Sequence, residues 1–272
     1  MGFGVELAKA HAYGNDFLIV RASELTDFPD LPAVVRKLCD RHRGIGADGV
    51  MIIEETPAGA DTRLFNADGS TSELSGNGVR CVGTVLSFER NMSAGDAVTI
   101  GTGAGPKVLT FLGAKRRCLS FRASMGPPED MRKASFDVAG QRVEAVVMRV
   151  GNPQCVVLGP QPDDERFRRL GSALEKHAIF PQGTNVEFAT VGDPRHVTIR
   201  IWERGCGPTL SSGTGSCASL VAAAAYGGAQ RDAEVIAPGG TQRVEWLDDG
   251  VYLTGWAEVI CEGEWSRPLP HG

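Results

Sequence analysis

The chain has 272 residues, more than a single hydrophobic core usually holds, so we expect two domains. Hydrophobic residues make up 42% and charged residues 22%, which is typical of a globular protein, and the net charge of -5 argues against nucleic acid as a partner. Because no run of about 18 apolar residues and no signal-peptide pattern is present, we expect a cytoplasmic protein without membrane contact.

The first half of the chain is predicted to hold short strands and two helices. Apolar runs bounded by turn residues indicate strands over residues 5–10, 17–21, 50–54 and 63–66. A proline stands at the start of the first predicted helix, residues 32–41. The second helix should begin at the glycines near Gly78 and end near Asn91, since apolar residues follow at a spacing of three to four.

The rest of the chain, from about residue 95, is richer in strand signals. Strands are predicted over residues 97–100, 107–112, 119–123, 142–150, 185–189, 196–201, 234–236, 243–246 and 251–253, with a proline-containing tail after them. Helices are predicted over residues 164–176 and 217–226. The chain is therefore assigned to the α/β class, more narrowly strand-rich α+β. The long strand runs do not alternate regularly with helices, which argues against a simple Rossmann sheet.

A short pattern occurs twice. Residues 74–78 read Leu-Ser-Gly-Asn-Gly and residues 210–215 read Leu-Ser-Ser-Gly-Thr-Gly, each before an apolar helix, and Ser75 and Ser212 are 137 positions apart. A Gly-x-Gly that leads into a helix exposes unpaired N–H groups at the positive end of the helix dipole, which favours an anion. One such pattern is usually only a tight turn. Its repetition in both halves favours two lobes that hold one anion between them.

The chemistry of such a site follows from its symmetry. A P-loop pattern is absent, so a small organic acid is favoured over a phosphate. Proton exchange at the α-carbon of an amino acid needs stabilisation of the developing enolate, together with a base on one face and an acid on the other. The two loops place Ser75 and Ser212 where these two groups are needed.

The seven cysteines are scattered and odd in number, without a C-x-x-C pair. We interpret them as reduced, mostly buried thiols, and no metal site is predicted. Cys81 and Cys217 lie in the helices that follow the two serines and are expected to face the core.

Several motifs occur in a characteristic order along the chain. They are Gly14-Asn15-Asp16-Phe17, Asp40-Arg41-His42-Arg43-Gly44-Ile45-Gly46-Ala47-Asp48, Phe65-Asn66-Ala67-Asp68-Gly69-Ser70, Gly151-Asn152-Pro153, Gly183-Thr184-Asn185-Val186 and Glu203-Arg204-Gly205. In this order they resemble the motifs of the diaminopimelate epimerase family, through nearly the whole chain.

The resemblance implies two pseudo-symmetric lobes, each a mixed sheet or barrel wrapped around a central helix, with the active site in the cleft between them. Residues 1–117 would form the N-terminal lobe, with the tail 262–272 packing back on it, and residues 118–261 the C-terminal lobe. The implied activity is cofactor-independent epimerisation of diaminopimelate, from LL to meso, in lysine and cell-wall precursor biosynthesis, or of a closely related amino acid. A homodimer is also implied.

The resemblance assigns roles residue by residue. Its catalytic positions are Ser75, Ser212 and Glu203. Five positions match those that hold the distal end of the substrate: Asn15, Asn66, Asn152, Asn185 and Arg204. Four more belong to the two helix-start loops and are expected to bind substrate: Gly76, Asn77, Gly213 and Thr214. No metal ligand is implied.

The sequence departs from the family at the catalytic positions, where the family has cysteine and this chain has Ser75 and Ser212. A thiol titrates near 8.5 and a helix N-terminus lowers that value, whereas a hydroxyl is a weak base unless another group takes its proton. Gln154 stands where the family usually has histidine, and Pro208 and Trp256 also depart. These departures put thiol-style epimerisation in doubt.

Three alternatives stay open at the level of sequence. The chain could be a related isomerase or dehydratase that uses serine. It could be a homologue that binds an amino acid without turning it over. It could also be a Cys-to-Ser mutant made to trap a substrate complex.

Overall fold

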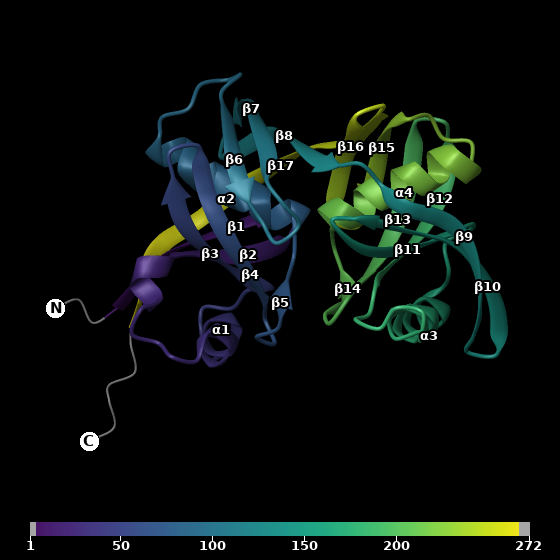
Figure 1. Ribbon diagram of the computed structural model, residues 1–272, viewed down its shortest axis with the longest axis horizontal. Coiled ribbons are helices and arrows are strands. Elements are labelled where there is room, and N and C mark those ends of the chain that lie inside the picture. Colours follow the sequence, from purple (N-terminus) through teal and green to yellow (C-terminus); the bar gives the residue numbers. More distant parts are fainter. Residues whose placement is uncertain (1–3, 267–272) are drawn as a thin grey trace.

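The computed structural model describes residues 4–266 as two lobes that lie side by side (Figure 1). One lobe is built from the first half of the chain and the other from the second, and the long last strand, β17 (Gly250–Ser266), runs from the second lobe into the first. The predicted strand-rich α+β class with two lobes is confirmed. Within residues 4–266, no helix is both long and apolar enough to cross a membrane.

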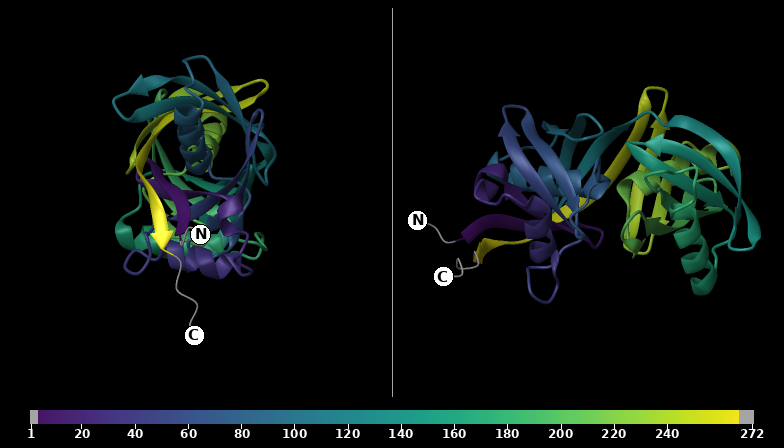
Figure 2. Two further views of the ribbon diagram at one scale, coloured as in Figure 1. Left: turned by 90° about the vertical axis from the view of Figure 1, so that its left-hand side faces the viewer. Right: turned by 60° about the horizontal axis from the view of Figure 1, so that its bottom comes forward.

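The first lobe is a ring of strands around one helix. In chain order it contains β1 (Gly4–Ala12), β2 (Asn15–Arg21), the short 3-10 helix η1 (Ala22–Leu25), α1 (Leu31–Cys39), β3 (Gly49–Thr56), β4 (Gly59–Asn66), β5 (Thr71–Ser72), α2 (Gly76–Glu89), β6 (Ala97–Gly101), β7 (Lys107–Lys115) and β8 (Cys118–Gly126). Strand pairing closes through β1, β2, β3, β4, β6, β7, β8 and β17 back to β1. Figure 2 shows α2 inside this ring. Since α2 is apolar or small on nearly every side, it suits a fully surrounded position.

The second lobe repeats this plan around another helix. It contains β9 (Glu129–Val138), β10 (Gln141–Val150), β11 (Asn152–Leu158), α3 (Asp164–Glu175), β12 (Asn185–Asp193), β13 (His196–Glu203), β14 (Gly207–Thr209), α4 (Gly213–Tyr226), β15 (Asp232–Ala237), β16 (Gly240–Leu247) and the start of β17. The sheet runs from β9 through β10, β11, β12, β13, β15 and β16 to β17 and curls around α4.

The repeat is visible in the pairing directions. Strands β2 and β3 are parallel with α1 between them, as β11 and β12 are with α3. Strands β4 and β6 are parallel with α2 between them, as β13 and β15 are with α4. The two Gly-x-Gly patterns therefore begin equivalent helices.

The structure corrects several predicted boundaries. The helix predicted over 217–226 begins four residues earlier, at Gly213, and the strand predicted over 251–253 continues to Ser266. Four strands were missed: β5, β9, β11 and β14. Strand β9 lacks an apolar signature because the first half of the strand is mostly charged and exposed. Strand β11 begins with Asn152-Pro153, a pair that is typical of turns.

The lobe boundary at 117/118 stays a prediction. Strand β8 begins just beyond it, and it pairs with β7 on one side and β17 on the other. Residues 262–266 pair with β1, and the rest of the predicted tail, 267–272, lies outside the described residues.

Candidate active site

The central helices of the two lobes meet at their N-termini. A β-carbon placed on Gly76, the first residue of α2, would lie 2.8 Å from the α-carbon of Gly213, the first residue of α4. Real β-carbons essentially never approach another atom so closely, so only glycine permits this contact. Both helix dipoles therefore direct their positive ends to one place between the lobes.

The two predicted catalytic serines cap these helices. Ser75 Oγ accepts a hydrogen bond from the Gly78 N–H at 3.0 Å, and Ser212 Oγ accepts one from the Gly215 N–H at 3.1 Å. Both serines have extended backbone, as N-cap residues usually do. Each hydroxyl oxygen thus lies in the positive field of a helix end, which stabilises negative charge on it and still leaves its own proton free to be donated.

A small cavity adjoins Ser75 and has a volume of about 30 Å³. Residues of both lobes line it: Asn15, Phe17, Asp48, Leu64, Asn66, Ser72, Leu74, Ser75, Glu203, Cys206 and Thr209. Four predicted site residues therefore meet here: Asn15, Asn66, Ser75 and Glu203. A space of this size holds a water-sized group, so a whole amino acid can enter only if the lining groups move.

Glu203 is the last residue of β13, and its carboxyl group has a strongly shifted pKa. Burial of its carboxyl group, together with the nearby negative charge of Asp48, raises the pKa of Glu203 to about 7. A carboxyl group with such a pKa can accept or donate a proton near neutral pH. Because it lines the same cavity as Ser75, it is a candidate to exchange a proton with that hydroxyl.

Asn77 joins the lobes rather than facing open space. Its Nδ2 donates to Asn15 Oδ1 at 3.1 Å and to the Ser211 carbonyl oxygen at 3.2 Å. Asn15 in turn donates to Asp48 Oδ2 at 2.8 Å. These bonds use the Nδ2 group of Asn77, a buried residue, and connect α2 to the second lobe through Ser211. The substrate role of Asn77 stays a prediction.

The predicted distal-end residues of the second lobe lie at strand ends. Asn185 Oδ1 accepts from the Arg204 N–H at 2.9 Å, and Asn152 Oδ1 accepts from Gln154. The Arg204 guanidinium donates to Glu73 Oε2 of the first lobe at 2.9 Å. This ion pair joins the two lobes, and the substrate role of Arg204 stays a prediction.

The loop residues after the two serines form the first turns of α2 and α4, and their substrate roles stay predictions. Gly76 and Gly213 form the contact between the helices, and Thr214 Oγ1 lies 3.4 Å from Ser212 Oγ. Ser212 and Thr214 are both buried.

Sequence reasoning missed two residues of the cavity as functional candidates. Asp48 stands within a quoted motif, and its carboxylate contacts Asn15. Cys206 follows the Glu203-Arg204-Gly205 motif, so position within the motif was the available signal. Burial of the thiol first, and the negative charge of Glu203 second, raise the pKa of Cys206 to about 12, which keeps it a thiol at neutral pH.

The cysteines of the two helices do not reach the site. Cys81 and Cys217 have no exposed surface, and burial raises the pKa of each to about 12. Their predicted orientation toward the core is confirmed, and neither can replace a thiol at position 75 or 212.

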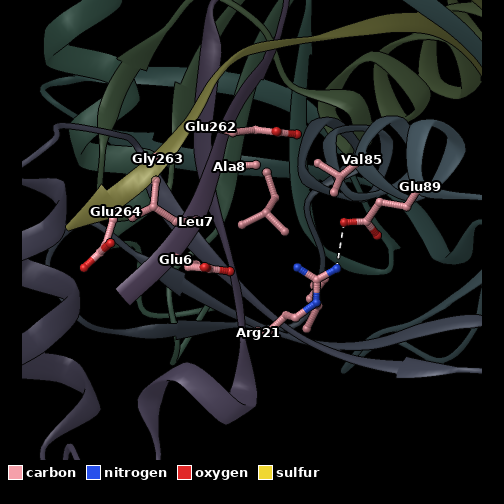
Figure 3. Close-up of a pocket in the computed structure, with 11 residues that line it drawn as sticks. Glu6, Leu7, Ala8, Arg21, Val85, Glu89, Glu262, Gly263 and Glu264 are labelled. Atoms are coloured by element: carbon pink, nitrogen blue, oxygen red, sulfur yellow. Dashed lines mark hydrogen bonds and ion pairs between the residues drawn. The ribbon is translucent and has the colours of Figure 1, made fainter. Parts of the chain in front are cut away.

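A larger hollow of about 370 Å³ lies elsewhere on the first lobe, between β1, β17 and α2 (Figure 3). Its charged lining is mostly acidic, from Glu6, Glu89, Glu262 and Glu264, and Arg21 donates to Glu89 at 2.7 Å. None of the predicted site residues lines it. Because acidic groups repel carboxylates, this hollow does not suit an anionic substrate.

Comparison with known proteins identifies relatives along nearly the whole chain. The sequence model of the family described as diaminopimelate epimerase matches residues 7–130 and 146–260. A diaminopimelate epimerase of Desulforudis audaxviator is 40% identical over 283 residues, covering 97% of this chain and 100% of that protein. One of Desulfitobacterium hafniense is 37% identical over 276 residues, covering 95% and 97%. The crystal structure of a probable proline racemase from Agrobacterium radiobacter K84 shares the fold, with a TM-score of 0.76 at 17% identity, covering 95% of this chain and 92% of that one.

Proposed function

The chain belongs to the diaminopimelate epimerase family, and we propose that it interconverts the LL and meso isomers of diaminopimelate without a cofactor, as a step in lysine and cell-wall precursor biosynthesis. It is an isomerase of that family. The observation that carries the proposal is the meeting of two serine-capped helix N-termini across Gly76 and Gly213, because this arrangement suits a carboxylate with a hydroxyl group on each side.

The reacting end of the substrate would bind at the helix ends. Free N–H groups and the two dipoles stabilise the negative charge that develops on the α-carboxylate as the α-proton leaves. Ser75 would act on one face of the α-carbon and Ser212 on the other. Glu203, which lines the cavity with Ser75, would take the proton that Ser75 releases, because its pKa of about 7 suits that exchange.

The distal end of the substrate would bind among the asparagines and Arg204. The Arg204 guanidinium matches a carboxylate in charge and fork geometry, and Asn152 and Asn185 start neighbouring strands beside it. Asn15 and Asn66 would bind from the first lobe, through the shared cavity. The substrate carboxylate would displace Glu73 from Arg204, which links binding to a rearrangement between the lobes.

The test is proton exchange in deuterated water. The pure LL isomer should yield the meso isomer with deuterium at the inverted α-carbon. Mass spectrometry measures the deuterium, and chiral chromatography separates the isomers. The double variant S75A/S212A, prepared in the same way, is the control for a contaminating epimerase. Absence of exchange at high protein concentration overturns the proposal, and release of an unsaturated acid would assign the site to lyase chemistry instead.

We also propose a homodimer located in the cytoplasm. Family membership supports the dimer, and the seven free cysteines suit a reducing compartment. Light scattering after gel filtration tests the dimer, and a monomeric mass at micromolar concentration would contradict it.

A further inference from the structure

One buried carboxyl group has no partner. Glu187 lies on β12, has no exposed surface, and neither of its carboxyl oxygens forms a hydrogen bond within the described chain. An unpaired buried carboxylate is costly, so such a group usually holds a proton or serves a function.

The position of this carboxyl group is defined by Gly215. A β-carbon on Gly215 would lie 2.6 Å from Glu187 Oε1 and 3.1 Å from Ser212 Oγ. The carboxyl group and the hydroxyl group therefore both lie close to one point in the first turn of α4. A side chain at 215 would clash with this carboxyl group, so glycine permits the arrangement.

The first lobe has a thioether at the equivalent place. A β-carbon on Gly78 would lie 2.9 Å from Met51 Sδ and 3.4 Å from Ser75 Oγ. Met51 lies on β3, which corresponds to β12 in the repeat. Since an apolar side chain packs there in the first lobe, packing alone does not require a carboxyl group in the second.

The surroundings of Glu187 favour its protonated form. Burial raises the pKa of Glu187 well above its ordinary value, and the negative charge of Glu203 raises it further. The other titratable neighbour is Cys155, whose pKa is itself raised, by burial first and by Glu187 second. Two carboxyl groups that repel each other tend to share one proton.

We propose that Glu187 is the proton reservoir behind Ser212, exchanging a proton with the Ser212 hydroxyl each time that hydroxyl exchanges one with the substrate α-carbon. Glu187 acts through Ser212 and is therefore a positioning residue. The inference rests on the proposed function, because it supplies the group that a serine needs in place of a thiol.

The proton balance closes over the two lobes. For an isomer whose α-hydrogen faces Ser75, the Cα–H bond breaks, Ser75 Oγ takes that proton, and the original hydroxyl proton passes to the Glu203 carboxylate. The electron pair remains on the α-carbon, delocalised into its carboxylate. Ser212 then gives its hydroxyl proton to the opposite face, and Glu187 restores that hydroxyl. After one turnover, one proton has moved from Glu187 to Glu203. Turnover of the other isomer moves a proton in the opposite direction, and proton exchange with water returns both carboxyl groups to their starting states.

Separate measurement of exchange and inversion tests the inference. In E187Q and E187M, inversion should fall by about 100-fold or more in both directions, as expected for loss of an acid–base group. Exchange without inversion should persist for the isomer whose α-hydrogen faces Ser75 and be lost for the other. The control is S219A, which removes another buried, unpartnered polar group on α4 and should leave both rates unchanged.

Either of two results overturns the inference. The first is an inversion rate in E187Q equal to that of the wild type. The second is an exchange rate that falls equally for both isomers, because such a loss indicates a purely structural defect. Thermal unfolding shows whether each variant is folded. Wild-type protein without any exchange would instead refute the proposed function. Infrared difference spectra then still test the proposed coupling of Glu187 to Ser212. The band of a protonated carboxyl group should be present in the wild type and absent in E187Q, and it should shift in S212A but not in S75A. A band that is missing in the wild type, or that S212A does not move, overturns the coupling.

Discussion

Gly76 and Gly213 lie in contact although they belong to different lobes, and a β-carbon on either would approach the α-carbon of the other to less than 3 Å. The contact fixes the distance between the serine caps that precede them. The two caps act as one site only while this contact is kept.

Replacing Gly76 with alanine should separate the helix ends. We expect G76A to lose about 1–3 kcal/mol of unfolding free energy, as overpacked cores do, and most epimerase activity. Denaturant unfolding and the LL-to-meso rate measure the two effects. Gly263 on β17 has open space around it, so G263A is the matched control and should change neither. Full activity in G76A would show that the close contact is not needed.

Thiols at the cap positions should accelerate the reaction. In S75C/S212C each thiol lies at a helix N-terminus, which lowers its pKa and supplies a stronger base than a hydroxyl. We expect the LL-to-meso rate to rise by about 100-fold or more, within the range of acid–base effects. The single variants S75C and S212C should give smaller gains, because each leaves one face with serine. A double variant no faster than wild type would mean that the serines are themselves the adapted groups.

Activity should depend on the charge of Glu203. Because its carboxylate must accept a proton from Ser75 and its pKa is about 7, the rate for the isomer that uses Ser75 as base should fall as the pH drops through 7. E203Q should abolish this rate at every pH. A rate profile that is flat between pH 6 and 8 would contradict the assignment.

The free energy of unfolding should also depend on Glu203, but it should fall as the pH rises. The pKa of Glu203 is raised from 4.5 to about 7 on folding, so its contribution to stability is complete below pH 4.5 and is lost as the pH rises through 7. E203Q should therefore gain about 1–3 kcal/mol of unfolding free energy relative to wild type between pH 4.5 and 8. A pH-independent difference in denaturant unfolding would argue against the raised pKa.

The cavity thiol should be dispensable. The pKa of Cys206 is raised to about 12 by burial and by Glu203, so it remains protonated and cannot serve as the base at neutral pH. We expect C206A to keep the epimerisation rate within about 3-fold of wild type, an effect below the size of a lost acid–base group. A loss of 100-fold or more would identify Cys206 as the replacement for the absent thiols.

Each serine should also contribute to stability as a cap. S75A and S212A each remove the acceptor for one helix N–H and should cost about 1 kcal/mol of unfolding free energy. S75G and S212G are the controls, because glycine at an N-cap costs only a few tenths of a kcal/mol. Equal stability of the alanine and glycine variants would contradict the capping role.

Local sequence patterns predicted much of this molecule. Periodic apolar residues located all four long helices, and the repeated Ser-Gly-x-Gly located the helix starts where Ser75 and Ser212 lie. Both signals depend on near neighbours in the chain, so they can be read without the fold. Strand β9 was not predicted because the charged first half of the strand is held in place by pairing with β10, and local composition does not encode that contact.

The sequence by itself determined the family, the strand-rich class and the pair of helix-starting loops, because motifs and periodicity are properties of short segments. Only the tertiary structure decided that the two loops touch, that Glu203 and Cys206 share a cavity with Ser75, and that Glu187 lies without a hydrogen-bond partner near Ser212. A pKa or a missing partner depends on which atoms surround a group in space. In the Ser75 cavity those atoms come from segments more than 100 residues apart in the chain, and around Glu187 they come from separate strands and a helix of one lobe.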